Sequence, residues 1–135
     1  MNIDEGNELI AEFLGYSRKV VRYQEKSYNS SNEFYYRWTE GELWCDEAGH
    51  PLDDEYDELL FHANWDWLMP LVFKIESLGC IVNISISLTN HIRIVNPSLD
   101  NMIISSIESN DLQEAIWLAC IDYITWYNIH CKTNE

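Results

Sequence analysis

Carboxylates are the chemistry-bearing side chains that this sequence concentrates most strongly. Between Trp38 and Phe73 the chain carries ten Asp and Glu residues and neither Lys nor Arg. Such a stretch projects a negative field, which attracts basic surfaces or cations and repels bare nucleic acid. The sequence therefore predicts an acidic, partner-binding surface formed by Glu40, Glu42, Asp46, Glu47, Asp53, Asp54, Glu55, Asp57 and Glu58.

The acidic run at 53–58 could also collect around a calcium ion. An EF-hand loop needs Gly at its sixth position and a bidentate Glu at its twelfth, and no register of this segment provides that pattern. A solvated acidic loop explains the same residues. We therefore predict no calcium ligands in this run.

A small hydrolase is the enzymatic alternative, with Asp66 or a loop carboxylate as the catalyst. Asp66 lies between Trp65 and Trp67, and an acid between aromatic rings suits a site that binds sugars. A core explanation competes with it, because the spacing of the two Trp residues also matches the apolar faces of a helix. The hydrolase hypothesis predicts a concave pocket that one of these rings lines and that holds a carboxylate with a raised pKa.

Nucleophilic and metal chemistry find little support in the remaining residues. Cys45, Cys80, Cys120 and Cys131 are predicted to be free thiols, since the chain lacks the features of a secreted disulfide scaffold. Cys45 and His50 form an isolated Cys–His pair, with no second pair to complete four zinc ligands. Hydrolase, phosphate-binding and dinucleotide-binding motifs are absent from the sequence. We predict no catalytic, cofactor-binding or metal-binding residues.

The overall charge narrows the range of partners. Eight basic residues oppose 23 acidic ones, for a formal net charge of -15, which disfavours direct binding of nucleic acid. No apolar run is long enough to cross a membrane, and the chain opens with acidic rather than basic residues. The expected location is therefore the cytoplasm, and the expected partner is a protein with a basic surface.

Hydrophobic periodicity predicts an α+β fold that places these side chains. With 135 residues and 47% hydrophobic composition, one domain over 1–135 is expected, frayed at 1–3 and 131–135. We predict an antiparallel sheet of three to five strands packed with three helices. The predicted helices span 4–14, 64–79 and 111–130, and the predicted strands span 80–88, 91–95 and 102–107, with a further hairpin of two short strands inside 33–45 around its turn at 39–41.

Two details of this prediction concern packing. Pro70 removes a backbone donor, so the helix at 64–79 is expected to kink or to begin near Trp67. The Trp, Tyr and Phe residues are expected to be used in building the core. The carboxylates would then be the distinctive groups on the surface.

Three blocks of sequence resemble a known family. AEFLGY at 11–16, FHANWDWLMPLVFKIESLG at 61–79 and LQEAIWLACIDYITWYN at 112–128 are similar, in that order, to the phage alpha–beta–alpha sandwich domain of small phage and prophage proteins. The resemblance implies an antiparallel sheet with helices on its faces and a phage or prophage setting. It implies no enzymatic activity.

The leading hypothesis for function is a non-enzymatic interaction protein of phage or mobile-element origin. Its acidic surface would bind a basic host or phage protein, for example as a DNA mimic that inhibits a host defence. The hydrolase above is one alternative. A homodimeric assembly subunit, closed by exposed apolar surface on helices that are apolar on two sides, is the other.

Overall fold

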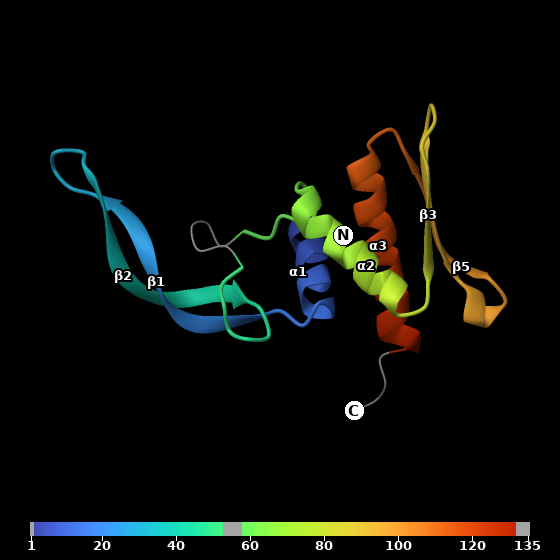
Figure 1. Cartoon of the computed structure of the whole chain (residues 1–135), viewed down its shortest axis with the longest axis horizontal. Coiled ribbons are helices and arrows are strands. Elements are labelled where there is room, and N and C mark those ends of the chain that lie inside the picture. The colour runs from blue at the N-terminus through green and yellow to red at the C-terminus, as the bar shows by residue number, and fades with distance from the viewer. Residues whose placement is uncertain (1, 53–57, 132–135) are drawn as a thin grey trace. The chain divides into compact units, whose positions relative to one another are not determined.

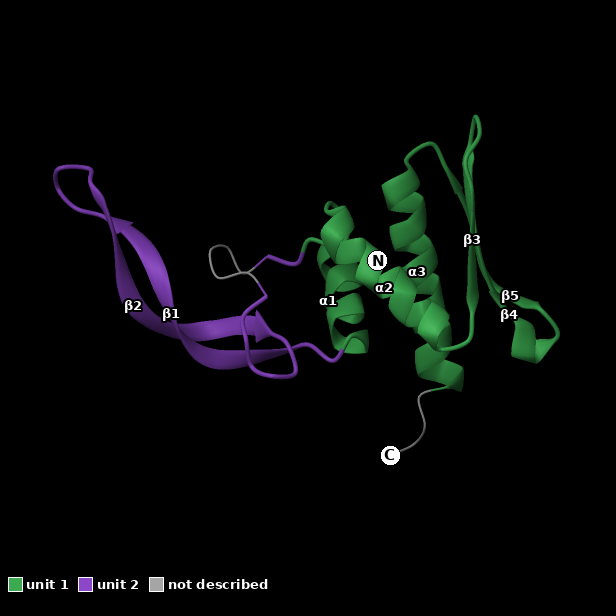
Figure 2. Ribbon diagram, in the orientation of Figure 1, with its two compact units in different colours: residues 1–14, 60–135 green, residues 15–59 purple. Residues whose placement is uncertain are grey.

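The fold is α+β, as predicted. The computed structural model describes residues 2–52 and 58–131, which form three α-helices and two antiparallel sheets (Figure 1). The chain divides into two compact units, residues 1–14 with 60–135 and residues 15–59 (Figure 2). The prediction of one domain over 1–135 stays a prediction. Within the described ranges, no helix combines the length and the apolar character that a membrane crossing requires.

The first unit contains the three helices and a three-stranded sheet. Its elements in chain order are α1 (Ile3–Phe13), α2 (Trp65–Ser77), β3 (Ile81–Ser85), β4 (Asn90–Asn96), the short 3-10 helix η1 (Pro97–Leu99), β5 (Met102–Ser109) and α3 (Leu112–His130). The sheet has the order β3-β4-β5 with antiparallel neighbours, so β4 is central. This arrangement agrees with the predicted sheet and three helices.

Helix α3 forms the centre of this unit. It contacts β4 and β5 as well as α1 and α2, and buried side chains therefore occur around most of its circumference. Asp111 caps its N-terminus by accepting a hydrogen bond from the backbone N–H of Glu114 at 3.1 Å. The predicted start of this helix, at residue 111, differs from the observed start at Leu112 by one residue.

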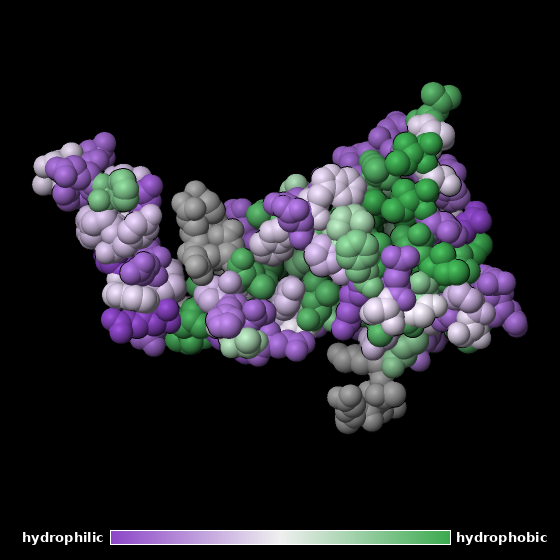
Figure 3. All heavy atoms as spheres, in the orientation of Figure 1, coloured by the Kyte–Doolittle hydropathy of each residue, from purple (hydrophilic) through white to green (hydrophobic). Residues whose placement is uncertain are grey.

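The sheet places one face against α3. Ile92 and Ile94 of β4 are fully buried, and Ser105 of β5, opposite Ile94, donates a hydrogen bond from its Oγ to Asp122 Oδ2 on α3 at 2.8 Å. At the edge strand β3 the covering is less complete. Hydrophobic residues reach the surface there, as Figure 3 shows on the side of this unit where β3 lies.

A polar contact joins α1 to the core. Asn7 is buried, and its Oδ1 accepts a hydrogen bond from Trp117 Nε1 at 2.9 Å. Its Nδ2 donates to His62 Nδ1 at 2.8 Å. The preceding residue, Gly6, lies directly against the indole of Trp117, where a Cβ would approach a ring carbon to 2.5 Å. The lack of a side chain at Gly6 therefore lets α1 approach α3 closely.

Helix α2 begins earlier than Pro70 suggested. Asn64 caps it by accepting a hydrogen bond from the backbone N–H of Asp66 at 2.8 Å, and the helix starts at Trp65 rather than Trp67. Pro70 lies inside the helix as its sixth residue. Leu68 and Leu71 flank it and are fully buried, and their packing against the core offsets the missing backbone donor.

The second unit is a long β-hairpin followed by a loop. β1 (Ser17–Tyr28) pairs with β2 (Phe34–Cys45) in an unbroken antiparallel register of twelve residue pairs. The predicted hairpin within 33–45 was wrong, because Gly41 lies inside β2 and the turn is at 29–33. Asn29 makes that turn: its Oδ1 accepts hydrogen bonds from the backbone N–H groups of Ser31 and Glu33.

Candidate functional site

The register of the hairpin sorts its side chains onto two faces. Residues directly opposite in an antiparallel pair point to the same side, and the partner of each even-numbered β1 residue is an even-numbered β2 residue. One face therefore combines basic residues of β1 with aromatic residues of β2. We name the part nearest the turn the basic–aromatic face; its members are Arg22, Gln24, Lys26, Tyr28, Phe34, Tyr36 and Trp38.

All seven of these side chains are exposed. Trp38 exposes 58% and Tyr36 60% of its surface, which is unusual for rings of this size. The expectation that the aromatic residues form the core is therefore wrong for Tyr28, Phe34, Tyr36 and Trp38, whereas Trp44 at the other end of β2 is buried. It holds for Trp117, Tyr123 and Phe61 in the first unit, which are buried.

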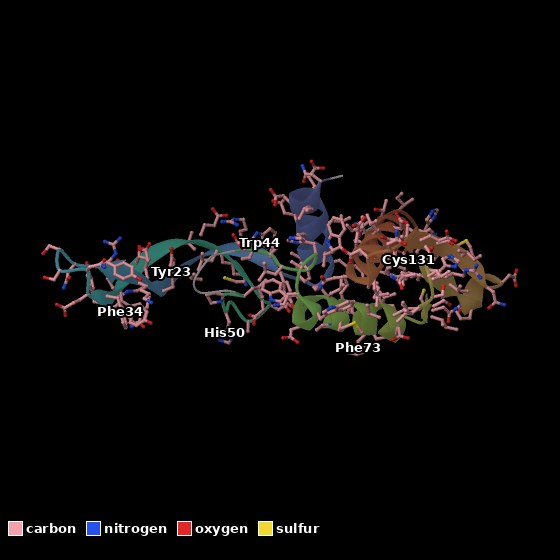
Figure 4. All side chains as sticks on the ribbon, turned by 90° about the horizontal axis from the view of Figure 1, so that it is seen from above. Tyr23, Phe34, Trp44, His50, Phe73 and Cys131 are labelled. Atoms are coloured by element: carbon pink, nitrogen blue, oxygen red, sulfur yellow. The ribbon has the colours of Figure 1, made fainter. Side chains whose placement is uncertain are left out.

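Cations lie over the rings of this face. The guanidinium carbon of Arg22 is 5.0 Å from the ring centroid of Trp38, and Lys26 Nζ is 4.6 Å from that of Phe34. These distances fit cation–π attraction, which contributes roughly 0.5–1 kcal/mol at an exposed site. Neither Arg22 nor Lys26 forms a salt bridge with another described residue. Their positive charges are therefore presented to solvent together with the rings. Figure 4 labels Phe34 near the turn end of the hairpin and Trp44 near its other end.

The opposite face of the hairpin consists of the odd-numbered residues of the same two strands, and its basic and aromatic residues have different surroundings. Arg37 on that face pairs with Glu25 at 3.3 Å, so its charge is neutralised across the strands. A side-chain carbon added at Gly41 would lie 3.4 Å from the ring of Tyr23, so the glycine leaves room for that ring. Tyr35 also belongs to this face, although it neighbours Tyr36 in sequence. The hairpin thus offers pairs of residues of the same type on opposite faces, Tyr35 with Tyr36 and Arg37 with Arg22.

The carboxylates predicted as a binding surface are distributed over several places. Glu42 lies on β2, where its Oε1 is 3.4 Å from Arg18 Nε, and Glu40 lies directly opposite Arg22 in the ladder. Glu47 and Glu58 are exposed in the loop that follows β2. Asp53, Asp54, Glu55 and Asp57 lie outside the described residues. Each of the two carboxylates on β2 therefore has a basic residue of β1 beside it: Arg18 for Glu42 and Arg22 for Glu40.

Asp46 has a local structural role. Its Oδ1 accepts hydrogen bonds from the backbone N–H groups of Ala48 and His50, both at 2.9 Å, and so closes a turn after β2. The hydrogen bond from His50 is the main reason why the pKa of Asp46 is lowered. Nearby, burial and then the charges of Asp46 and Glu47 raise the pKa of Tyr16. The Asp46 carboxylate therefore stays ionised and holds the turn.

The residues of the hydrolase hypothesis lie on α2. Trp65 is two-fifths exposed, and Trp67 is half-buried with its ring edge-on to Phe61, the centroids being 5.2 Å apart. Asp66 between them is exposed in the first turn of the helix. An exposed acidic residue in the first turn is ordinary for a capped helix, because the helix dipole favours a negative charge there. Nothing in the placement of these three residues favours the hydrolase, which stays a prediction.

The thiols are dispersed through the chain. Cys45, Cys80 and Cys120 are buried free cysteines, and Cys131 is exposed. Burial raises the pKa of Cys120 to about 12 and also raises that of Cys80. Among residues 2–52 and 58–131, no three His, Cys, Asp or Glu side chains group in a way that could hold a metal ion.

Sequence reasoning missed the basic–aromatic face, although a signal for it was present. Phe34, Tyr36 and Trp38 recur at every second position, and Arg18, Arg22 and Lys26 at every fourth. Both spacings place side chains on one face of a strand. The basic residues and the aromatic residues lie on separate strands, and each spacing by itself indicates only one strand face. The register that joins the two was not predicted.

Comparison with known proteins adds no neighbour to this description. No family model, no curated protein and no solved structure matches the chain. The relation to the phage alpha–beta–alpha sandwich domain therefore stays a prediction from the sequence.

Proposed function

We propose that this protein is a non-enzymatic protein-interaction module that binds its partner through the basic–aromatic face of the β1–β2 hairpin. The observation that carries the proposal is the exposure of Tyr28, Phe34, Tyr36 and Trp38 on one side of a two-stranded ribbon. An isolated two-stranded hairpin is marginally stable in water. A partner laid over this face would bury the rings and stabilise the ribbon at the same time.

The composition of the face suits a protein interface. Aromatic residues and Arg are enriched where proteins bind each other, and Trp, Tyr and Arg supply most of the energetically dominant contacts. Each aromatic side chain can bury roughly 150–250 Å². The four exposed rings therefore offer enough apolar area to anchor a partner, while Arg22 and Lys26 provide orientation.

The charge of the face indicates an acidic contact surface on the partner. Arg22 and Lys26 are the basic residues of this face; Glu40 lies directly opposite Arg22 in the ladder but forms no salt bridge with it among the described residues. Carboxylates of the partner could pair with these cations where they already lie over the rings. A polyanion such as nucleic acid would instead meet the net charge of -15 of the chain, and this repulsion favours a compact protein partner.

The experiment compares variants of the full chain that differ in hairpin face. Wild-type protein and the Tyr36→Ser, Tyr35→Ser, Arg22→Ala and Arg37→Ala variants would be immobilised and used to capture partners from nuclease-treated lysate. We expect Tyr36→Ser and Arg22→Ala to lose a partner that the matched variants Tyr35→Ser and Arg37→Ala retain. Purified partner would then be titrated, with a loss of at least about tenfold in affinity expected for Tyr36→Ser.

Three outcomes would contradict the proposal. One is a partner that all four variants retain equally well. Another is a partner whose binding is weakened equally by the variants on either face. The third is capture that nuclease treatment abolishes, together with binding of a short single-stranded oligonucleotide by the purified protein, because the ligand would then be nucleic acid. Circular dichroism of each variant shows whether it is folded.

The phage or prophage setting and the cytoplasmic location are part of this proposal, supported by the sequence alone. A basic partner, including the DNA-mimic version, depends instead on the loop carboxylates. Glu47→Gln and Glu58→Gln would weaken binding of such a partner while leaving binding through the basic–aromatic face unchanged. The same capture experiment with these two variants therefore separates the two kinds of partner.

A further inference from the structure

The edge strand β3 of the first unit lacks the features that normally prevent strands from pairing with other molecules. Proteins protect exposed edges with charged side chains, Pro, bulges or a covering segment. From Ser77 to Ile92 the sequence contains no Asp, Glu, Lys, Arg or Pro, and no uncharged stretch of this chain is longer. The register shift of the sheet lies between Ile94 and Val95, where β4 pairs with β5, and so leaves β3 regular.

Large apolar side chains surround this edge. Ile81 and Ile84 in the strand are exposed by 46% and 39%, and in the connection to β4 the exposure rises to 70% at Ile86 and is complete at Leu88. Figure 3 shows the corresponding hydrophobic surface where β3 lies in Figure 1. The outer side of β3 also carries backbone N–H and C=O groups that the β4 ladder does not use, because among the strands of residues 2–52 and 58–131 β3 pairs with β4 alone.

We propose that β3 pairs edge to edge, antiparallel, with β3 of a second copy of this chain, forming a symmetric dimer with a continuous six-stranded sheet. Antiparallel pairing of identical strands satisfies the two-fold symmetry of an isologous interface. It joins the unused backbone groups in a ladder and buries Ile84 and Ile86 of each copy. This interaction is separate from binding through the hairpin.

Charge is the reason for choosing a second copy as the occupant. Two copies each carry a net charge of -15 and repel each other wherever their acidic surfaces approach. The uncharged stretch at 77–92 brings no carboxylate of its own to such a contact. It also offers no charge by which a different protein could be selected, whereas an identical edge supplies the same apolar side chains and the same backbone pattern.

The first test measures mass against concentration. Light scattering on the full chain should show a monomer–dimer equilibrium, and Ile86→Lys should raise the dissociation constant of the dimer at least about tenfold by placing two like charges in the interface. The matched control is Ile129→Lys, because Ile129 is also exposed by 70% but belongs to α3 rather than to the uncharged stretch at 77–92. This control should leave the dissociation constant unchanged.

The second test locates the strand pair chemically. In a Cys131→Ser background, which leaves the buried thiols Cys45, Cys80 and Cys120, single cysteines would replace Asn83, Ser85 or Ser87. The pairing in which Ile84 of one copy lies opposite Ile86 of the other places the two-fold axis at Ser85, so that Ser85 faces its own copy. We therefore expect the variant at Ser85 to form a disulfide dimer much faster than the others under mild oxidation.

The proposal is overturned if the protein stays monomeric at all concentrations up to about the millimolar range, which in free energy is already a very weak association. It is also overturned if Ile86→Lys and Ile129→Lys weaken the dimer equally, or if no position crosslinks. The dependence on salt distinguishes the β3 dimer from binding through the hairpin. Added NaCl should strengthen the β3 dimer, because it screens the repulsion between the two copies. It should weaken binding of an acidic partner to the basic–aromatic face.

Discussion

At the scale of single residues, Asn7 is a buried polar group that joins α1 to the core of the first unit. It is buried and bridges α1, Trp117 and His62 through its amide group. Replacing Asn7 by Ala would leave the indole N–H of Trp117 buried without this acceptor. Leaving such a donor unsatisfied costs about 1–3 kcal/mol.

We therefore predict that Asn7→Ala lowers the free energy of unfolding by about 2 kcal/mol, measured by urea denaturation. Asn128→Ala, an exposed Asn on α3, serves as the control and should change stability by less than about 0.5 kcal/mol. Equal stability of Asn7→Ala and the wild type would show that the bridge does not contribute.

The thiols provide a prediction that depends on pH. Burial raises the pKa of Cys120 from 9.0 to about 12, whereas Cys131 is exposed. Native protein at pH 8 should therefore react with a thiol reagent at Cys131, and Cys120 should react only after unfolding. Mass spectrometry of the labelled peptides measures both rates, and rapid labelling of Cys120 in native protein would contradict the prediction.

The same pKa also affects stability at high pH. Because the folded pKa of Cys120 lies above the unfolded value, the protonated thiol favours the folded state fully below about pH 9. This contribution is lost as the pH rises toward about 12. In a Cys120→Ala variant the fall in stability over this window should be smaller.

At the scale of elements, the close approach of α1 to α3 requires Gly6. A helix-interior Gly is ordinarily less favourable than Ala by roughly 0.5–1 kcal/mol, so Gly6→Ala would stabilise an unconstrained helix. Here the new Cβ would meet the Trp117 ring at 2.5 Å and the Ile121 side chain at 2.7 Å. Neither group can move without disturbing the core.

We predict that Gly6→Ala lowers the free energy of unfolding by about 1–3 kcal/mol, the usual range for an overpacked core. Glu8→Ala is the matched control, since Glu8 is exposed on the same helix and its change should be within about 0.5 kcal/mol. Thermal or urea unfolding measures both variants. A gain in stability for Gly6→Ala would mean that α1 and α3 lie farther apart than described.

How well the sequence predicted each element depended on how local its determinants are. The range 64–79 was close to the observed helix α2, because Asn64 before its start and Gly79 after its end both act within one turn, whereas the start near Trp67 that Pro70 suggested was wrong. The β1–β2 hairpin was mispredicted because Gly41 indicates a turn locally, whereas the Asn29 turn wins by allowing twelve residue pairs. Pairing energy of that kind is summed over the whole ladder and cannot be seen at one residue.

At the scale of the whole molecule, the net charge of -15 destabilises the compact state through repulsion between carboxylates. Raising NaCl from about 20 mM to about 300 mM shortens the Debye length from roughly 20 Å to roughly 6 Å. At one low protein concentration we expect the melting temperature to rise by about 4 °C, which corresponds to roughly 1 kcal/mol.

Choline chloride at the same ionic strength should raise the melting temperature equally, because screening does not depend on the cation. A rise with NaCl alone would indicate specific ion binding. A melting temperature that does not change with salt would mean that the carboxylates lie too far apart to repel one another appreciably.

The sequence by itself determined the α+β class, the three helices and the strands of the three-stranded sheet, because periodicity and end residues act over a few positions. It also determined the charge. Only the tertiary structure decided that Trp38 and Tyr36 are exposed while Trp117 and Tyr123 are buried. The physical reason is that alternation shows that a strand has two faces, whereas the layer packed over each face comes from residues far away in the chain. The contact between Arg22 and Trp38 is an example, because it forms across a turn whose position no short stretch of sequence indicates.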